Sequence, residues 1–372
     1  MTTDLLAPQR DPDPRLAGIV CLAEFESIAR ERMHPASFDY VAGGAGDELT
    51  LVESEAAWRR YRLRPRVLVD VSTVETTTTF VGAPASIPVA IAPMAGHALA
   101  HPEAEVATAR AAAAAGVPFT LSTMASRSIE EVAAAAPDGV RFFQLYVQRD
   151  RGFARSLVER AAGGGYRAIV LTVDLPVVGY RDRDRRSGFA LDIPLGNFAA
   201  GLPGEELVSG YQALGGQRHI GLTWDDLEAI RGWSSLPLVV KGIMTGDDAR
   251  LAVEHGADAI LVSNHGARQL DRVAAPVDVL AEVVNAVAGA AEVWVDGGVR
   301  RGVDPAIALA LGARGVLVGR PILYALAAGG EAGVGRALAI LREELEVCLA
   351  LLGVRRLAEL GPAHLVRTEP GR

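Results

Sequence analysis

The sequence predicts an α/β protein built on a (β/α)8, or TIM, barrel. From residue 88 onward, short runs rich in β-branched residues alternate with Ala-, Leu-, Glu- and Arg-rich segments of helical period. This alternation is typical of parallel strands that helices bury on both faces. An open, doubly wound sheet can host the same alternation, but eight units in succession favour closure into a barrel.

Eight strands are expected, each a short apolar run bounded by turn residues. In chain order they are 88–93, 118–122, 141–147, 167–173, 237–242, 258–263, 292–296 and 314–318. Helical segments follow nearly every strand, at 102–115, 128–136, 150–162, 223–231, 247–255, 277–288, 302–311 and 331–351.

Three stretches lie outside this alternation of strands and helices. Residues 175–222 form a Gly-rich insertion between the fourth and fifth strands, and loops of this length are usually lids or disordered. Residues 22–61 contain two helical runs around the turn-prone AGGAGDE, and we expect them to cap one end of the barrel. We expect residues 1–20 to be a flexible tail before one barrel domain spanning 21–365.

Composition excludes several functional classes. The net charge of −8 and pI near 5.5 disfavour a nucleic-acid partner, which requires a concentrated basic surface. Cys21 and Cys348 are too few for a disulfide framework and are not spaced as metal ligands, so a reducing compartment is expected. The N-terminus lacks the features of a secretory signal, and no run of about 18 apolar residues occurs. We therefore expect a soluble, cytoplasmic protein with no membrane partner and no metal.

Polar residues occupy the predicted carboxyl ends of the strands, where barrels of this class carry their chemistry. Gln144 and Tyr146 end the third strand, Thr172 and Asp174 the fourth, and Lys241 the fifth. An unpaired buried charge costs on the order of several kcal/mol, so a binding site explains these residues better than packing does.

The last two strand ends carry a phosphate signal. Gly297-Gly298 and Gly319-Arg320 let backbone N–H groups approach an anion, and a guanidinium can fork onto phosphate oxygens. Either pair alone would indicate a tight turn, but together they predict a phosphorylated ligand or cofactor. No Rossmann glycine fingerprint follows the first strand, which argues against a nicotinamide cofactor.

The run SNHGARQLD at 263–271 resembles the signature of the FMN-dependent 2-hydroxy-acid oxidases and dehydrogenases, the group of glycolate oxidase and lactate oxidase. The resemblance extends from about residue 22 to 360. Further matching segments are 38–48, 101–116, 142–147, 171–181, 238–243 and 295–304. The resemblance implies an FMN cofactor, oxidation of an (S)-2-hydroxy acid to the 2-oxo acid, reduction of O2 to hydrogen peroxide, and a homo-oligomer, either a tetramer or an octamer.

The family's catalytic roles carry over to matching positions. Imidazole accepts protons near neutral pH, and the resemblance implies that His265 is the base, with Asp174 bonding its imidazolium. Guanidinium forks match carboxylates, and the resemblance assigns substrate binding to Arg181 and Arg268. The phenols implied to orient the substrate are Tyr40 and Tyr146, the second of which is also a predicted catalytic residue.

The implied flavin contacts come mostly from strand ends. Lys241 would lie beside the pyrimidine edge, where a fixed positive charge stabilises the reduced ring, and it is therefore also a predicted catalytic residue. The other implied contacts are Ala95 at the reactive edge, Ser122, Gln144, Thr172 and Ser263 on the ring, Asp296 on the ribityl chain, and Gly298, Arg300, Gly319 and Arg320 on the phosphate.

Two departures from the family pattern leave the identity of the substrate open. Met124 stands where many relatives carry an aromatic residue, and residues 94–97 differ from the common family run. The flexible thioether of Met124 predicts a pocket for a medium, long or aromatic side chain.

One alternative function is a same-family dehydrogenase that reduces a quinone or cytochrome, although the polar stretch 190–222 favours an oxidase. A lyase or isomerase acting on a phosphorylated substrate through a Schiff base on Lys241 is another.

Overall fold

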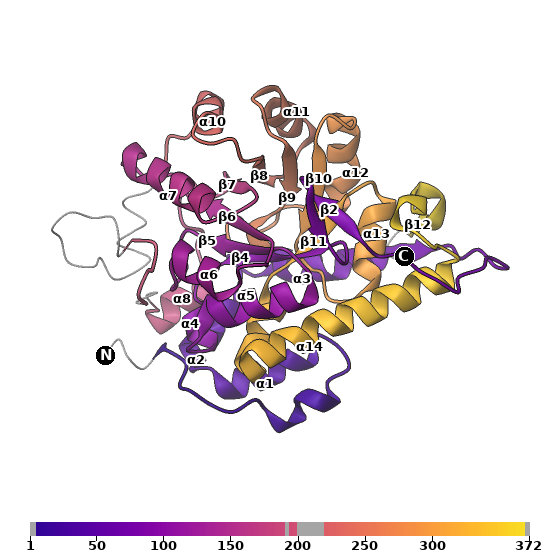
Figure 1. The fold of residues 1–372 in the computed structure, drawn as a ribbon, viewed down its shortest axis with the longest axis horizontal. Helices are drawn as coiled ribbons and strands as arrows, with labels where there is room; N and C mark the ends of the chain where they lie inside the picture. Colours follow the sequence, from indigo (N-terminus) through magenta and orange to yellow (C-terminus); the bar gives the residue numbers. More distant parts are fainter. Residues whose placement is uncertain (1–4, 190–192, 199–218, 369–372) are drawn as a thin grey trace.

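Eight parallel strands close into a barrel in the computed structural model, which describes residues 5–189, 193–198 and 219–368 (Figure 1). The predicted (β/α)8 barrel is confirmed, and each strand begins and ends within two residues of its predicted bounds. In order around the barrel the strands are β4 (Val89–Met94), β5 (Phe119–Ser122), β6 (Arg141–Leu145), β7 (Ile169–Thr172), β8 (Leu238–Ile243), β9 (Ala259–Val262), β10 (Glu292–Asp296) and β11 (Gly315–Val318).

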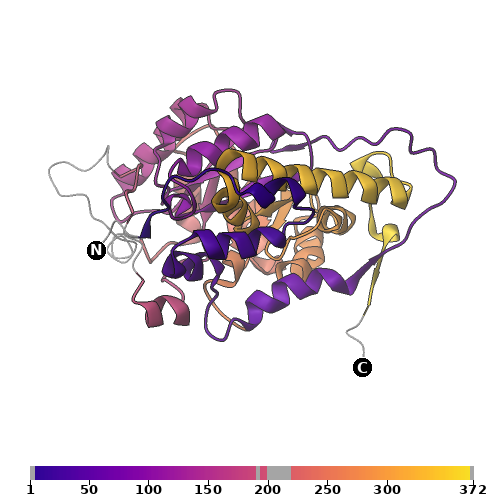
Figure 2. The same cartoon turned by 90° about the horizontal axis from the view of Figure 1, so that it is seen from below.

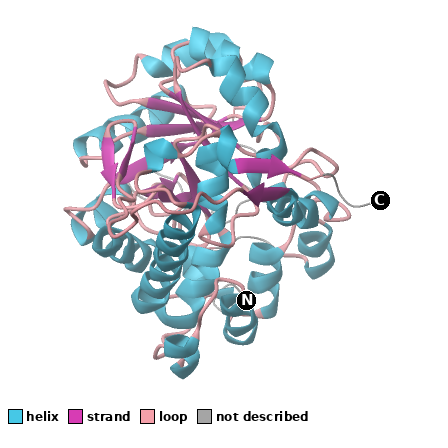
Figure 3. Ribbon diagram, turned by 90° about the vertical axis from the view of Figure 1, so that its right-hand side faces the viewer, coloured by secondary structure: helices cyan, strands magenta, loops and turns pink. Residues whose placement is uncertain are grey.

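Helices surround the strands (Figure 3). They are α5 (Ala104–Ala115), α6 (Ile129–Ala135), α7 (Arg151–Gly163), α10 (Trp224–Arg231), α11 (Gly246–Glu254), α12 (Pro276–Val287), α13 (Val303–Ala310) and α14 (Arg320–Leu352). The last helix begins at Arg320, well before the predicted residue 331. It is interrupted at Gly329 and Gly330, whose non-helical dihedrals break the helical pattern at this point.

A short hairpin, which no sequence pattern predicted, plugs the amino-terminal end of the barrel. Strand β2 (Thr78–Phe80) pairs with β3 (Ala83–Ala85), and Phe80 packs edge-on against Trp294 with ring centroids 5.0 Å apart. Phe142 stacks on the same indole at 5.7 Å. Packed rings therefore fill this end of the barrel, and the carboxyl ends of the strands remain as the place for a ligand.

The N-terminal helices cover that opposite, carboxyl end. They are α1 (Glu24–Arg32), α2 (Pro35–Ala42) and α3 (Leu49–Ala57). The Trp58 indole N–H donates to the carbonyl of Gly297 over 2.9 Å, and the Asn264 amide donates to Ser54 Oγ over 3.0 Å. Helix α1 lies along α14 (Figure 2). The predicted helical cap is therefore present at the end where the strands place their polar residues.

Smaller elements complete the fold. Residues 5–20 include the turn Pro14–Gly18, and the Asp13 N–H donates to the carbonyl of Ala328 over 2.8 Å. The separation into a tail, 1–20, and a domain, 21–365, stays a prediction. The remaining elements are α4 (His97–Ala100), α8 (Asp182–Ser187) and the antiparallel pair β1 (Tyr61–Leu63) and β12 (Leu365–Arg367). No helix within the described residues is both long and apolar enough to span a membrane.

The insertion after β7 is anchored where the structure describes it. Ile193, Leu195 and Phe198 are buried, and the amide of Asn197 donates to the carbonyls of Ser122 and Thr123, both over 3.1 Å. The segment is thus tied directly to the end of β5. The remainder of the predicted lid, 190–192 and 199–218, lies outside the described residues.

Candidate active site

A cavity opens at the carboxyl ends of the barrel strands, beneath α2. The predicted site residues that line it are Tyr40, Ala95, Ser122, Met124, Tyr146, Thr172, Arg181, Lys241, His265, Arg268, Asp296, Gly298, Arg300, Gly319 and Arg320. The other predicted residues, Gln144, Asp174 and Ser263, lie directly behind this lining and hydrogen-bond to it. The structure therefore brings the whole predicted set together.

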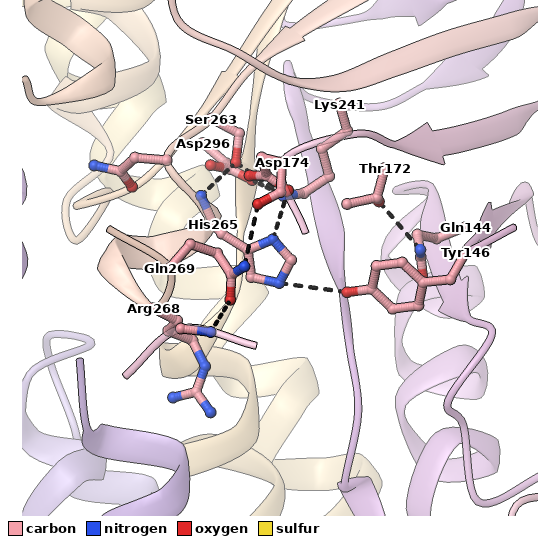
Figure 4. Close-up of polar contacts among 12 residues, drawn as sticks. Gln144, Tyr146, Thr172, Asp174, Lys241, Ser263, His265, Arg268, Gln269 and Asp296 are labelled. Carbon is pink, nitrogen blue, oxygen red and sulfur yellow. Dashed lines mark hydrogen bonds and ion pairs between the residues drawn. The ribbon is translucent and has the colours of Figure 1, made fainter. Parts of the chain in front are cut away.

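His265 lies between an acid and a phenol (Figure 4). Its Nδ1 is 2.8 Å from Asp174 Oδ1, and its Nε2 is 3.3 Å from the hydroxyl of Tyr146. Burial lowers the pKa of His265, and the opposing effect of Asp174 does not restore it to the ordinary value. The imidazole is therefore neutral near pH 7, and with Nδ1–H directed at Asp174 its Nε2 can accept a proton.

A left-handed turn presents this imidazole to the cavity. His265, Gly266 and Ala267 have φ values of 59°, 62° and 60°, a conformation that costs roughly 1–3 kcal/mol for each non-glycine residue. Ser263 Oγ accepts the N–H of His265 over 3.1 Å, and Asn264 Oδ1 accepts that of Ala267 over 3.0 Å. These two bonds hold the strained backbone that aims the base.

Asp174 is kept ionised beside the base. Burial by itself would raise its pKa, but the interaction with His265, through charge when the ring is protonated and through the hydrogen bond, and the charge of Lys241 outweigh that effect, so the pKa lies below its usual value. Gly242 makes room for this carboxylate, since a Cβ there would lie 2.6 Å from Asp174 Cβ. Sequence reasoning missed Gly242. A glycine inside a strand, which often marks a close approach, was the available signal.

Lys241, on β8, is buried and held by residues at the ends of β9 and β10. Its Nζ donates to Ser263 Oγ over 2.9 Å and lies 3.6 Å from Asp296 Oδ2. The second oxygen of Asp296 is buried and has no hydrogen-bond partner among the described residues. The cluster thus supplies a fixed ammonium and an acceptor that a ligand hydroxyl can satisfy.

A row of side-chain hydrogen bonds crosses the ends of β5, β6 and β7. Ser122 Oγ donates to Gln144 Oε1 over 3.1 Å, and Gln144 Nε2 donates to Thr172 Oγ1 over 3.1 Å. The row places several polar groups along one wall, which suits the heteroatoms of a flat ring lying against it.

Three arginines gather at the end of the cavity near Gly319. Burial, followed by the charge of Arg268 and the further charge of Arg300, lowers the pKa of Arg320 to about 9. Arg320 donates to the carbonyls of Val41, Gly43 and Gly266, and Arg300 pairs with Glu55. Such crowding of positive charge favours an anion in this part of the cavity.

The glycine next to this arginine cluster is required by the packing. A Cβ at Gly298 would collide with the backbone of Ser54, and its φ of 77° is left-handed. Helix α3 therefore approaches the β10 end so closely that only glycine fits, and its backbone lines the cavity.

One side of the cavity is covered by a stack of three side chains from distant segments, which we call the roof. The guanidinium of Arg268 lies 4.8 Å from the ring centroid of Tyr40, and that ring stacks on Phe189 at 4.6 Å. Arg268 Nη1 also donates to the carbonyl of Tyr40 over 2.7 Å, and Arg181 Nε donates to that of Arg268 over 3.1 Å. Sequence reasoning missed Phe189, an isolated aromatic residue after a charged run.

A methionine, Met124, also contributes to the lining of the cavity. Met124 is buried and lines the cavity immediately after β5, and its N–H donates to Ser122 Oγ over 3.1 Å. The described residues contain no group of three or more His, Cys, Asp or Glu side chains that could hold a metal ion.

Comparison with known proteins gives consistent results. The family model described as FMN-dependent dehydrogenase matches residues 29–367. The chain is 50% identical to the L-lactate oxidase of Nostoc sp., covering 92% of this chain and 97% of that protein. It is 48% identical to the glycolate oxidase of Spinacia oleracea, covering 92% and 94% respectively. A crystal structure of mandelate oxidase with (S)-4-hydroxymandelic acid superposes with a TM-score of 0.87 at 44% identity, covering 94% of this chain and 98% of that one.

Proposed function

This chain belongs to the family of FMN-dependent dehydrogenases, and we propose that it oxidises a 2-hydroxy acid to the 2-oxo acid and passes the electrons to O2, forming hydrogen peroxide. The observation that carries the proposal is the placement of His265 between Asp174 and Tyr146 in a cavity that also holds Lys241.

The residues of the cavity fit FMN. Asp296, with an oxygen that has no partner among the described residues, would accept a ribityl hydroxyl, and Arg300 and Arg320 would hold the phosphate. The row from Ser122 to Thr172 would meet the ring. When bound, the flavin supplies a two-electron acceptor that can be reoxidised by O2.

The chain's own residues would bind the substrate and move its proton. The forks of Arg268 and Arg181 would hold the carboxylate, with the phenol of Tyr40 beside them. His265 Nε2, which faces the hydroxyl of Tyr146 in the same cavity, would take up the proton released on oxidation. Asp174, ionised at 2.8 Å, stabilises the imidazolium that results.

The two alternatives are less well supported. The curated relatives reported above are oxidases, which favours O2 over a quinone or cytochrome as acceptor. A Schiff-base lysine must present a free Nζ to a substrate carbonyl, whereas Lys241 Nζ donates to Ser263 Oγ over 2.9 Å and lies 3.6 Å from Asp296 Oδ2.

An anaerobic titration tests the proposal. We expect the purified protein to carry flavin absorbance that (S)-lactate or (S)-mandelate bleaches without oxygen. Air should then restore the colour and release one peroxide per 2-oxo acid. A flavin that no 2-hydroxy acid bleaches would refute the proposed reaction. Bleaching followed by reoxidation with a quinone but not with O2 would instead identify a dehydrogenase.

Within this reaction class, we propose a substrate with a medium, long or aromatic side chain. Met124 lines the pocket, and a flexible thioether can pack on an apolar group where a stiff ring would close the space. Each buried methylene contributes about 0.8 kcal/mol, so kcat/KM should rise from glycolate through lactate to 2-hydroxyoctanoate or mandelate. Met124→Trp should reverse this ranking. A wild type that prefers glycolate would refute the proposal.

We also propose that the protein is a homo-oligomer in the cytoplasm. Val67 and Leu68 are 81% and 103% exposed, and apolar side chains this exposed favour contact with another copy. Cys21 and Cys348 are free thiols, as suits a reducing compartment. Light scattering of the purified protein tests the first proposal, since a monomeric mass would contradict it.

A further inference from the structure

The cavity wall contains two sulfur atoms in different environments. Of the chain's five methionines, Met94 and Met124 line the cavity. Met94 Sδ lies toward Gly319, 3.5 Å from where a Cβ on that glycine would be, at the end proposed to hold the phosphate. Met124 follows Ser122 and bonds to its hydroxyl, at the end proposed to hold the flavin ring. Although Met94 directly precedes Ala95, its sulfur points toward the phosphate end, whereas Met124 follows the end of β5 that is proposed to meet the ring.

A thioether at that position is exposed to an oxidant that bulk solvent does not deliver. Buried methionines are usually protected from peroxide because the oxidant cannot reach them. Met124 is only 3% exposed, yet the cavity that it lines is where the proposed reaction makes hydrogen peroxide. The local peroxide concentration at this sulfur is thus set by turnover and not by diffusion from outside.

We propose that Met124 is a self-oxidation site, which this enzyme converts to methionine sulfoxide with the peroxide from its own turnover. This inference rests on the proposed function. A sulfur lone pair attacks one peroxide oxygen, the O–O bond breaks, and that oxygen stays on sulfur. The other oxygen leaves as water after a proton transfer, so sulfur loses two electrons and the peroxide gains them.

Other features of the cavity would assist the oxidation of Met124 and explain why it would change activity. Tyr146 lines the same cavity, and its hydroxyl, 3.3 Å from His265 Nε2, can relay the proton from the oxygen that stays on sulfur to the departing oxygen. The product replaces a flexible apolar side chain by a polar one in the wall proposed to receive the substrate side chain. Turnover then weakens the binding of apolar 2-hydroxy acids, so activity declines with the number of cycles completed.

Peptide mapping after turnover tests the proposal directly. The holoenzyme is run aerobically with (S)-mandelate or (S)-lactate in the presence of excess catalase, which destroys peroxide once it leaves the protein. We expect the Met124 peptide to gain one oxygen in proportion to turnovers, at least threefold faster than the peptides of Met33, Met94 and Met244. Equal oxidation of all four peptides, or complete protection by catalase, would overturn the proposal.

Failure of the inference is distinguishable from failure of the proposed function. If peroxide is formed in proportion to the 2-oxo acid while Met124 stays unmodified, the self-oxidation site is refuted and the reaction stands. If no 2-hydroxy acid yields peroxide, both the proposed reaction and the self-oxidation site are refuted.

A pair of leucine variants gives a second readout. Leucine is close to methionine in volume and has no oxidisable sulfur. With each variant normalised to its own initial rate, Met124→Leu should lose activity per turnover at least threefold more slowly than wild type. Met244→Leu, outside the cavity, should decline as wild type does. Methionine sulfoxide reductase should restore the aged wild type, and an unchanged rate of decline in Met124→Leu would count against the proposal.

Discussion

The rim of the barrel and the roof over the cavity are built in different ways. On the rim, interacting residues sit on neighbouring strands in fixed register, as with Ser122 opposite Gln144 and Thr172 opposite Lys241. In the roof, the contact from Arg268 to Tyr40 joins residues 228 positions apart, and Phe189 joins from the insertion. Rim geometry follows from the backbone ladder, whereas roof geometry depends on segments that only meet when the chain is folded.

This difference predicts a division of labour. The base, its acid and the lysine lie at or just beyond strand ends and are held by short side-chain contacts with one another and with Ser263, so changes there should act on the chemical step. The roof contacts are stacks and single hydrogen bonds between loops and helix ends, so changes there should act mainly on substrate binding. The four experiments below test this division, from the largest expected effect to the smallest.

Removing the base should have the largest effect. His265→Ala is expected to slow anaerobic flavin reduction by about 10²–10⁴-fold, since no other histidine lines the cavity within the described residues. The flavin spectrum should be retained, because the proposed cofactor contacts lie on other side chains. Near-normal bleaching would show that the rim does not hold the base.

Neutralising the acid should alter the pH profile as well as the rate. Asp174→Asn is expected to reduce kcat/KM by roughly 10–10²-fold through loss of a charge-assisted hydrogen bond. Burial places the pKa of His265 below its usual value, and the charge of Asp174 raises it, so removing that charge lowers it further. The acid limb of kcat/KM should therefore move to lower pH in the variant. A shift to higher pH would contradict this electrostatic role.

The carboxylate fork should affect binding more than chemistry. Arg268→Lys keeps the charge but loses the planar fork, and KM is expected to rise about tenfold. Arg186→Lys is the matched control, since that side chain is 76% exposed and pairs only with Asp182 among the described residues. Equal KM values in both variants would mean that the roof does not bind the carboxylate.

Loosening the aromatic stack should have the smallest effect. Phe189→Leu removes a ring pair worth about 0.5–1.5 kcal/mol, so KM is expected to rise roughly two- to tenfold with kcat little changed. Phe198→Leu removes a comparable pair with Phe153, also in the insertion but outside the cavity. Both variants should lose similar thermal stability, and only the first should change KM. If Phe189→Leu changed kcat as much as KM, the roof would affect the chemical step as well as substrate binding, which would contradict the proposed division.

The sequence by itself determined the barrel and its rim. Strand and helix periodicities are local, so the eight strands could be located within two residues. Once the strands are placed, a closed parallel barrel brings all their carboxyl ends to one rim. That is why Lys241, His265 and Asp296 could be assigned to one site before any distance was known.

Only the tertiary structure decided what closes the two ends of the barrel. The hairpin that carries Phe80, the room that Gly242 leaves for Asp174, and the stack of Phe189 on Tyr40 depend on packing between remote segments. The early start of α14 at Arg320 has a related cause, because the glycine pair at 329 and 330 hides the continuity of the helix along the sequence. Such contacts produce no periodic pattern in the sequence, because the two partners are far apart along the chain and become neighbours only in the folded structure.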